Sequence, residues 1–185
     1  MKIDLTLRVD PRTITAQQAD VNRFYGHLGT HFDVMDRVFP LDYTELKGIV
    51  FDVSAIDQRD IEVSDIDLER VEPGMFVAFF TGFMNRFEYG SETYRHSHPQ
   101  LSHQLIEQLV ERKTAIIGVD CAGIRRGREH SPADQYCADH GCFVVENLCA
   151  LDQLAKVTGR LIIHTYPLSI STLTGQPCRV IAETD

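Results

Sequence analysis

Two histidines and an aspartate lie close together near the start of the chain, in the segment GHLGTHFDVMD at positions 26–36. His27 and His31 are four residues apart, and Asp33 follows two residues later. Imidazole nitrogens and a carboxylate oxygen suit zinc or manganese, and three protein ligands leave positions open for water or substrate. Water bound to such a cation ionises near neutral pH and becomes a nucleophile. The residue types are therefore typical of a metal-dependent catalytic loop.

The same spacing also fits a helix that carries an incidental pair of histidines, because residues i and i+4 share one helix face. Gly29 costs a helix about 1 kcal/mol relative to alanine, and Thr30 is β-branched, so a turn or an extended loop is favoured. Gly29 also lets the backbone turn sharply enough to bring both imidazole rings to one point. The spacing alone leaves both interpretations open.

The elements that must position these residues are strands and a few helices. Apolar residues with a helical period predict a helix over 100–112, and start and stop signals predict another over 132–139. Ile66 to Arg70 is compatible with a short helix. Alternating or continuous apolar runs predict strands at 3–9, 48–54, 75–80, 115–119, 143–145, 161–163 and 179–182. We expect a mixed α/β fold, in which the sequence leaves the strand order undetermined.

Composition favours one soluble domain that acts on a small molecule. A chain of 185 residues fits a single domain, and 43% hydrophobic with 24% charged residues is ordinary for a globular protein. No apolar run approaches the ~20 residues of a membrane span, and the first residues do not resemble a secretory signal. The net charge of −9 argues against a nucleic-acid partner. We expect a cytoplasmic protein with a small-molecule substrate, and neither nucleic-acid nor membrane binding.

The cysteines argue against a zinc ribbon or a thioredoxin-type site, because none of the five forms a CxxC pair. Several lie in or beside apolar segments, where free cysteine behaves as a small hydrophobic residue. We expect reduced cysteines in the core at positions 121, 137, 142, 149 and 178.

The segment HLGTHFD resembles the HxGTHxD motif of the cyclase family, which includes bacterial kynurenine formamidase and isatin hydrolase. The resemblance continues along nearly the whole chain, in the family's order and spacing. Its other parts are Ile3–Thr6 for DLT, Pro73–Gly74 with Thr81–Phe83 for PGD…TGW, His98–Pro99 for HP, Gly118–Asp120 for GID, Glu146–Leu148 with Leu151–Asp152 for ENLxNLD, and Gly175–Arg179 for GxPxR.

The resemblance implies a single swivelling β/β/α domain over residues 1–185 that assembles as a homo-oligomer, a dimer or tetramer. It also implies hydrolysis of an amide, lactam or formamide C–N bond with a divalent cation, Zn²⁺ or Mn²⁺. It assigns metal ligation to His27, His31 and Asp33, with Glu146 at or beside the metal. Glu146 or His130 would then move protons during catalysis.

Three positions depart from the family pattern. The motif continues as HxGTHxDxPxH, but Met35 stands at the proline position and Arg37 at the third histidine. Asp134 stands where the family has a histidine twelve residues before the glutamate of ENL. In formamidase-like members both histidines help to hold a second metal, and a guanidinium cannot ligate. We therefore predict one cation per chain.

Three roles are open for Arg37. It could pair with Glu146 or Asp134, it could bind a substrate carboxylate in the catalytic site, or it could form a surface salt bridge.

Other segments carry weaker signals. The basic loop from Arg125 to His130 follows a predicted strand, where ligands tend to bind in α/β sheets, but a solvated surface loop is the favoured interpretation. For His96, His98 and His103, around the start of the predicted helix at 100–112, capping or packing is the favoured role. The motifs GxSxG, GxGxxG and GxxxxGK[ST] are absent, which disfavours acyl-enzyme, dinucleotide and phosphoryl-transfer chemistry.

The leading hypothesis is a metal-dependent hydrolase. Two alternatives remain. One is a metal-assisted lyase or dehydratase with Arg37 on a substrate carboxylate, and the other is a non-catalytic protein that binds a metal or a small molecule.

Overall fold

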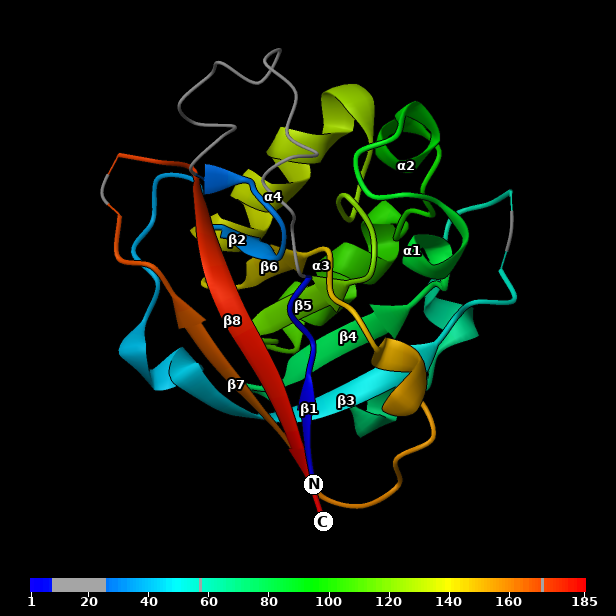
Figure 1. The fold of residues 1–185 in the computed structure, drawn as a ribbon, viewed down its shortest axis with the longest axis vertical. Helices are drawn as coiled ribbons and strands as arrows, with labels where there is room; N and C mark the ends of the chain where they lie inside the picture. The colour runs from blue at the N-terminus through cyan, green and yellow to red at the C-terminus, as the bar shows by residue number, and fades with distance from the viewer. Residues whose placement is uncertain (8–25, 57, 171) are drawn as a thin grey trace.

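The computed structural model describes residues 1–7, 26–56, 58–170 and 172–185 (Figure 1). In this part of the chain, eight strands form one mixed sheet in the order β1-β8-β2-β6-β5-β4-β3-β7. The strands are β1 (Lys2–Asp4), β2 (His31–Asp33), β3 (Glu45–Asp52), β4 (Phe76–Phe80), β5 (Ile116–Val119), β6 (Phe143–Glu146), β7 (Leu161–Pro167) and β8 (Gly175–Thr184). The α-helices are α1 (Phe83–Arg86), α2 (Glu92–His96), α3 (His103–Glu111) and α4 (His130–Asp139). Short 3₁₀ turns are η3 (Leu41–Thr44), η4 (Val63–Asp65), η5 (Leu68–Arg70), η6 (Gly127–Glu129) and η7 (Leu151–Gln153).

Strand β8 closes the sheet into a barrel-like core. It pairs antiparallel with β2 at its first residues, with β7 over most of its length, and with β1 near its end. Strands β3, β4, β5 and β6 run parallel to one another, and β2 joins β6 antiparallel. The long red strand in Figure 1 is β8, and it passes from the β2 end of the molecule to the two chain ends. One strand thus connects the segment of β2 to the far side of the barrel.

The central strands read as continuous apolar runs because both of their faces are covered. In β4, Val77 and Phe79 pack in the cluster that contains the buried faces of α3 and α4, whereas Phe76 and Ala78 belong to the cluster on the other face. Successive strand residues point to opposite faces, so one strand contributes to both clusters. The sheet therefore lies between two hydrophobic layers.

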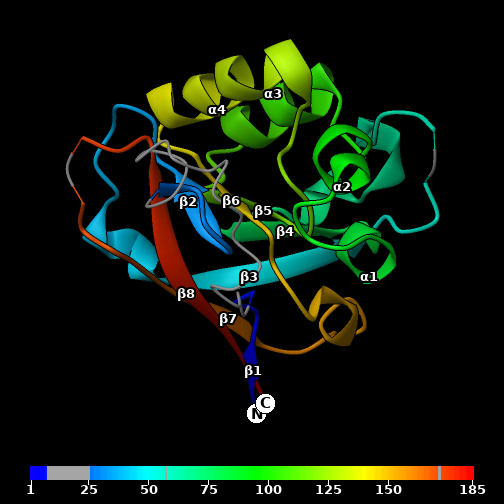
Figure 2. The same ribbon diagram turned by 45° about the horizontal axis from the view of Figure 1, so that its top comes forward.

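The two longer helices lie side by side over one face of the sheet (Figure 2). Leu105, Ile106 and Leu109 form the buried face of α3, and the Ser102 hydroxyl accepts a hydrogen bond from the Leu105 amide at 3.2 Å. A serine N-cap starts the helix there, three residues later than the apolar period suggested. Both predicted helices are confirmed, with α4 beginning two residues earlier than expected.

Several predicted elements have different bounds. The first strand is β1, shorter than the predicted strand at 3–9, and Val9 lies outside the described residues. The predicted short helix at 66–70 is the 3₁₀ turn η5. Helices α1 and α2 were not predicted, because four or five residues are too few to show a period.

The predicted core position is confirmed for four of the five cysteines. None forms a disulfide, four are buried, and Cys149 is half-buried. Within the described ranges, no helix has the length and apolar character needed to cross a membrane.

Candidate metal centre

Two adjacent strands place three of the predicted site residues on one face. His31 and Asp33 are two residues apart on β2, so their side chains point to the same side of the sheet. Glu146 stands directly opposite His31 in the register of β2 and β6. Directly opposed residues in paired strands share a face. The His31 Nε2 atom accordingly lies 3.5 Å from Glu146 Oε2 and 3.8 Å from Asp33 Oδ1.

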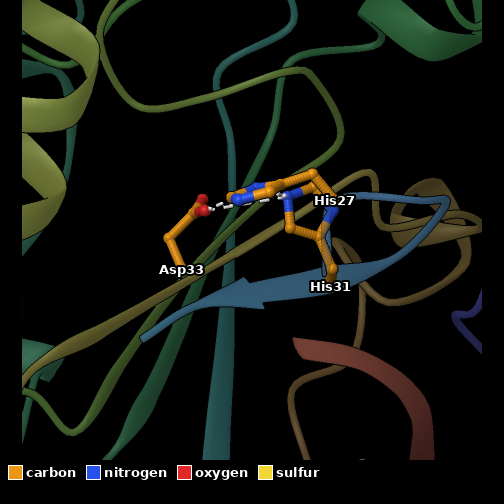
Figure 3. A group of neighbouring side chains, drawn as sticks. All are labelled: His27, His31 and Asp33. Carbon is orange, nitrogen blue, oxygen red and sulfur yellow. Dashed lines mark hydrogen bonds and ion pairs between the residues drawn. The ribbon is translucent and has the colours of Figure 1, made fainter. Parts of the chain in front are cut away.

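His27 reaches the same point from the turn that precedes β2. Gly29 has a φ of 65°, which folds the segment back so that both imidazoles meet the carboxylate. The His27 Nδ1 atom lies 3.0 Å from Asp33 Oδ1 and 3.1 Å from His31 Nε2, as Figure 3 shows. The second histidine and the aspartate lie on a strand, whereas the sequence favoured a turn or an extended loop for the segment, and a regular helix is excluded.

A network of hydrogen bonds holds this turn in place. The Asn147 side-chain amide donates to the Gly29 carbonyl at 2.9 Å, and the Thr30 hydroxyl donates to the Asn147 carbonyl at 2.8 Å. The Tyr94 hydroxyl donates to Asn147 Oδ1 at 2.6 Å, and the Gly29 amide donates to the Tyr89 hydroxyl at 2.9 Å. Sequence reasoning missed the supporting roles of Asn147, Tyr94 and Tyr89. The position of Asn147 directly after Glu146 was the available signal.

Helix α4 brings two further groups to the cluster. His130 and Asp134 are one helical turn apart, and His130 Nε2 lies 3.4 Å from Asp134 Oδ2 and 3.6 Å from Glu146 Oε1. The other ring nitrogen, Nδ1, lies 3.1 Å from the Arg125 carbonyl, to which it can only donate. This contact assigns the Nδ1–H tautomer to a neutral His130 and leaves the lone pair of Nε2 facing the carboxylates.

The carboxylates are buried and incompletely satisfied. Asp33 Oδ2, Asp134 Oδ1 and Glu146 Oε1 are inaccessible to solvent and lack a hydrogen-bond partner among the described residues. Buried carboxylate oxygens without partners are costly, whereas oxygen and imidazole ligands around a divalent cation are satisfied. Ligands about 2.0–2.2 Å from one ion lie roughly 3.0–3.6 Å from one another. The His27–Asp33 and His27–His31 separations, 3.0 and 3.1 Å, lie in this range, and the His31–Asp33 separation, 3.8 Å, is slightly longer. The donor set therefore fits a divalent cation.

Two overlapping groups of candidate ligands lie within the described part of the chain. His27, His31 and Asp33 form one group, and Asp33, His130, Asp134 and Glu146 form the other, with ligand atoms within 4.8 Å of one another in each group. Asp33 belongs to both. Asp134 replaces the family histidine with another group that can ligate, and it is 1% exposed.

The titration behaviour of the carboxyls reflects their crowding. Burial raises the pKa of Asp33, but the neighbouring charges of His31 and His27 outweigh burial and hold that pKa at about 2. Burial and the charge of Asp33 raise the pKa of Asp134 well above its ordinary range. The pKa of Glu146 is raised in the same way by burial, Asp33 and Asp134. The raised pKa values favour the protonated forms of Asp134 and Glu146, and added positive charge would favour their ionised forms.

A cavity of about 640 Å³ lies over this cluster. The ligand candidates and His130 line it, together with Tyr89, Arg95, His96 and Arg126. The basic loop from Arg125 to His130 thus contributes to the site, as one of the two interpretations of that loop expected.

Arg37 does not reach the cluster. Its side chain is 49% exposed, its Nε donates to Asp139 Oδ1 at 3.1 Å, and it also lies 3.4 Å from Asp36. Met35 adopts a φ of 55° in a turn closed by a hydrogen bond from the Arg37 amide to the Val34 carbonyl, and this turn directs Arg37 to the surface. Of the three roles left open for Arg37, pairing with Glu146 or Asp134 is not found in the structure. Placing it among the catalytic residues is not supported by this geometry, and the surface salt bridge is the alternative that holds.

Comparisons with known proteins agree with the architecture. The model of the family described as "Putative cyclase" matches residues 3–125. Isatin hydrolase A from Ralstonia solanacearum superposes with a TM-score of 0.77 at 19% identity, covering 98% of this chain and 91% of its own. Isatin hydrolase A from Labrenzia aggregata, bound to benzyl benzoate, gives 0.76 at 20% identity, covering 98% and 93%. A structure described as a "Potential Metal-Dependent Hydrolase With Cyclase Activity" gives 0.76 at 19% identity, covering 98% and 96%. The matched motifs, the barrel-like mixed sheet and the family match together show that the chain belongs to the cyclase family.

Proposed function

We propose that the protein is a metal-dependent hydrolase that cleaves an amide, lactam or formamide C–N bond of a small molecule. One observation carries the proposal: two imidazoles and unsatisfied buried carboxylates converge beside a cavity large enough for a small aromatic molecule. The fold shared with isatin hydrolases supports the same class of reaction.

His27, His31 and Asp33 would hold one divalent cation, Zn²⁺ or Mn²⁺, with Glu146 at or beside it. The cation would supply a Lewis acid that polarises a carbonyl oxygen and lowers the pKa of water. We propose one cation per chain because Arg37, at the position of a family ligand, faces the surface.

His130 and Glu146 would move protons. The Nε2 lone pair of His130 faces the cluster, and the ring is 31% exposed, so it can reach both the cluster and a molecule in the cavity. In that position it can accept a proton from attacking water and return it to the leaving nitrogen. Asp134, 3.4 Å from Nε2, would orient the ring and stabilise its protonated form.

The first test measures cation content and activity together. Purified protein is examined by elemental analysis, and N-formyl aromatic amines and cyclic imides are assayed before and after chelation. We expect that chelation abolishes the activity and that Zn²⁺ or Mn²⁺ restores it. The His31→Ala variant should lose both the activity and the cation. His140→Ala, which removes an exposed histidine, is the matched control and should retain both. A cation-free protein whose activity is indifferent to His31→Ala would contradict the proposal.

A second test separates hydrolysis from elimination. Hydrolysis in oxygen-18 water places one labelled oxygen in the product acid, whereas a lyase or dehydratase reaction leaves the acid unlabelled. The lyase hypothesis assigned carboxylate binding to Arg37, and the surface position of that residue argues against that assignment. We expect the labelled acid, detected by mass spectrometry.

A further inference from the structure

Two arginines line the cavity over the cluster. Arg95 belongs to α2, and Arg126 precedes η6 in the basic loop. The Arg126 backbone amide donates to Gln100 Oε1 at 2.7 Å, and its Nη1 donates to the His96 carbonyl at 3.4 Å. Arg126 is thereby held against the residue that follows Arg95. Both arginines therefore belong to the part of the wall near the end of α2.

No carboxylate of the described residues forms an ion pair with either of these two cations, Arg95 and Arg126. The whole chain nevertheless carries a net charge of −9. The neighbouring Arg125 shows the contrast, because Asp60 and Glu129 both bind its guanidinium.

The cavity therefore presents two chemically different regions. One is the cluster of histidines and carboxylates that fits a cation. The other holds the two arginines, for which the described part of the chain supplies no carboxylate partner. A guanidinium group binds a carboxylate through two parallel hydrogen bonds, and the match in shape adds specificity.

We propose that Arg95 and Arg126 bind a carboxylate of the substrate, so that the preferred substrate is a carboxylate-bearing amide or formamide. The inference rests on the proposed function, since the C–N bond of the substrate would lie at the cluster while its carboxylate binds the two arginines. It gives these two residues the role that the sequence left open for Arg37.

The kinetic test uses matched substrates. N-Formyl-3-aminobenzoate and N-formyl-4-aminobenzoate are compared with their methyl esters, which keep the formamide and remove the negative charge. In the cation-replete wild type we expect a higher kcat/KM for the acids. Arg95→Gln combined with Arg126→Gln should reduce that preference about tenfold to a hundredfold, the range expected for a lost charge-assisted hydrogen bond. Arg128→Gln, an exposed arginine of the same loop that does not line this cavity, should keep the preference.

A binding test does not depend on turnover. Isophthalate offers one carboxylate to the cation and one to the arginines, whereas benzoate offers only one, and both are titrated into cation-replete protein by calorimetry. We expect tighter binding of isophthalate in wild type and in Arg128→Gln, and no such advantage in the double variant. Circular dichroism checks that the double variant is folded.

The outcomes separate the two ideas. Suppose that no formamide or imide is cleaved, but that wild type binds isophthalate more tightly than benzoate and the double variant does not. This result supports the anion site and counts against the hydrolase. Cleavage with equal kcat/KM for acids and esters in wild type, or a preference that the folded double variant retains, overturns the anion site and leaves the hydrolase standing.

Discussion

The buried carboxylates of the cluster lie close enough to repel one another when ionised, and a bound cation would offset this repulsion. Asp33, Asp134 and Glu146 are each at most 4% exposed, and each has a buried oxygen that no described residue satisfies. A buried carboxyl group without compensation either takes up a proton or destabilises the fold. The cluster is therefore better explained as a binding site than as a stabilising element of the core.

Arg37 provides a direct check on the placement of the site. We expect Arg37→Gln to keep kcat/KM and cation content within about twofold of wild type, because exposed ion pairs contribute little. Steady-state kinetics and elemental analysis measure both quantities. A large loss of activity, with the protein still folded, would mean that Arg37 acts at the cluster after all.

His98 should make the fold sensitive to mild acid. Burial lowers the pKa of His98 to about 4, although its contact with the Pro99 carbonyl opposes the shift. The unfolded chain takes up this proton near pH 6.5 and the folded chain only near pH 4. The contribution of His98 to stability is thus fully present above about pH 6.5. As the pH falls from 6.5 to 4, this contribution is lost and the free energy of unfolding decreases by a few kcal/mol.

Urea unfolding at a series of pH values, in cation-free buffer, measures this loss. His98→Asn keeps a donor for the Pro99 carbonyl and removes the titration, so its free energy of unfolding should fall less steeply between pH 6.5 and 4. His140→Asn, at an exposed position, should leave the wild-type slope unchanged. Identical slopes for wild type and His98→Asn would show that His98 is not the titrating group.

At the scale of elements, much of the fold can be predicted from the sequence. Continuous apolar runs such as 75–80 and 115–119 correspond to strands. A strand in a sheet that is covered on both faces needs apolar residues at every position. The apolar period of 100–112 corresponds to α3 for a similar reason, since one face of it is buried. The closure of the sheet by β8 could not be predicted, because strand pairing depends on contacts between distant segments.

Part of the candidate site can also be predicted from the sequence, and part of it cannot. The His27, His31 and Asp33 group follows from a local motif, and the position of Glu146 follows from the family resemblance. The outward turn at Met35 and the contribution of Arg95 depend on backbone conformation and on a helix too short to show a period. Neither leaves a pattern in the sequence that distinguishes a cavity residue from an exposed one.

Strand β8 also limits the space around the first ligand. A Cβ atom on Gly175 would lie 2.6 Å from the Gly26 carbonyl oxygen and 2.8 Å from Cε1 of His27. We therefore expect Gly175→Ala to displace His27 and weaken Zn²⁺ binding about tenfold or more, as changes beside metal ligands do. Competition with a chromophoric chelator measures the affinity. Gly159→Ala, whose added Cβ would meet its nearest atom at 3.6 Å, should bind Zn²⁺ as wild type does. Equal affinity in both variants would contradict this account.

At the scale of the whole molecule, cation removal should lower thermal stability. A ligand that binds only the folded state at a thousand times its Kd stabilises that state by about 4 kcal/mol, which for a chain of this size raises Tm by on the order of 10 °C. We expect a decrease of that order on chelation and recovery with Zn²⁺ or Mn²⁺, followed by scanning calorimetry. Elemental analysis of the recovered protein should give one cation per chain. An unchanged Tm in protein shown to contain the cation would contradict its placement in the folded core.

We also propose that the protein is a cytoplasmic homo-oligomer, a dimer or tetramer. Val38 and Leu41 are 88% and 84% exposed, and η3, which begins at Leu41, packs against β7, where Tyr166 is 55% exposed. Exposed large apolar side chains that gather in one region are typical of an interface. Sedimentation velocity should show a species larger than one chain, and Leu41→Lys should shift it towards the monomer. A wild type that is monomeric at micromolar concentration would rule the assembly out.

The pairing of distant segments at the site has a consequence for the order of events in folding. Thr174, which lies 3.0 Å from His27 Nε2, comes 147 residues later in the chain, and Thr30 is anchored by Asn147, 117 residues away. Contacts of such long range form late, because the intervening chain must first lose its freedom. During synthesis the ligands of β2 emerge long before the segments that hold them in place. Cation uptake should therefore follow the completion of the barrel, and the ion should slow unfolding without accelerating folding.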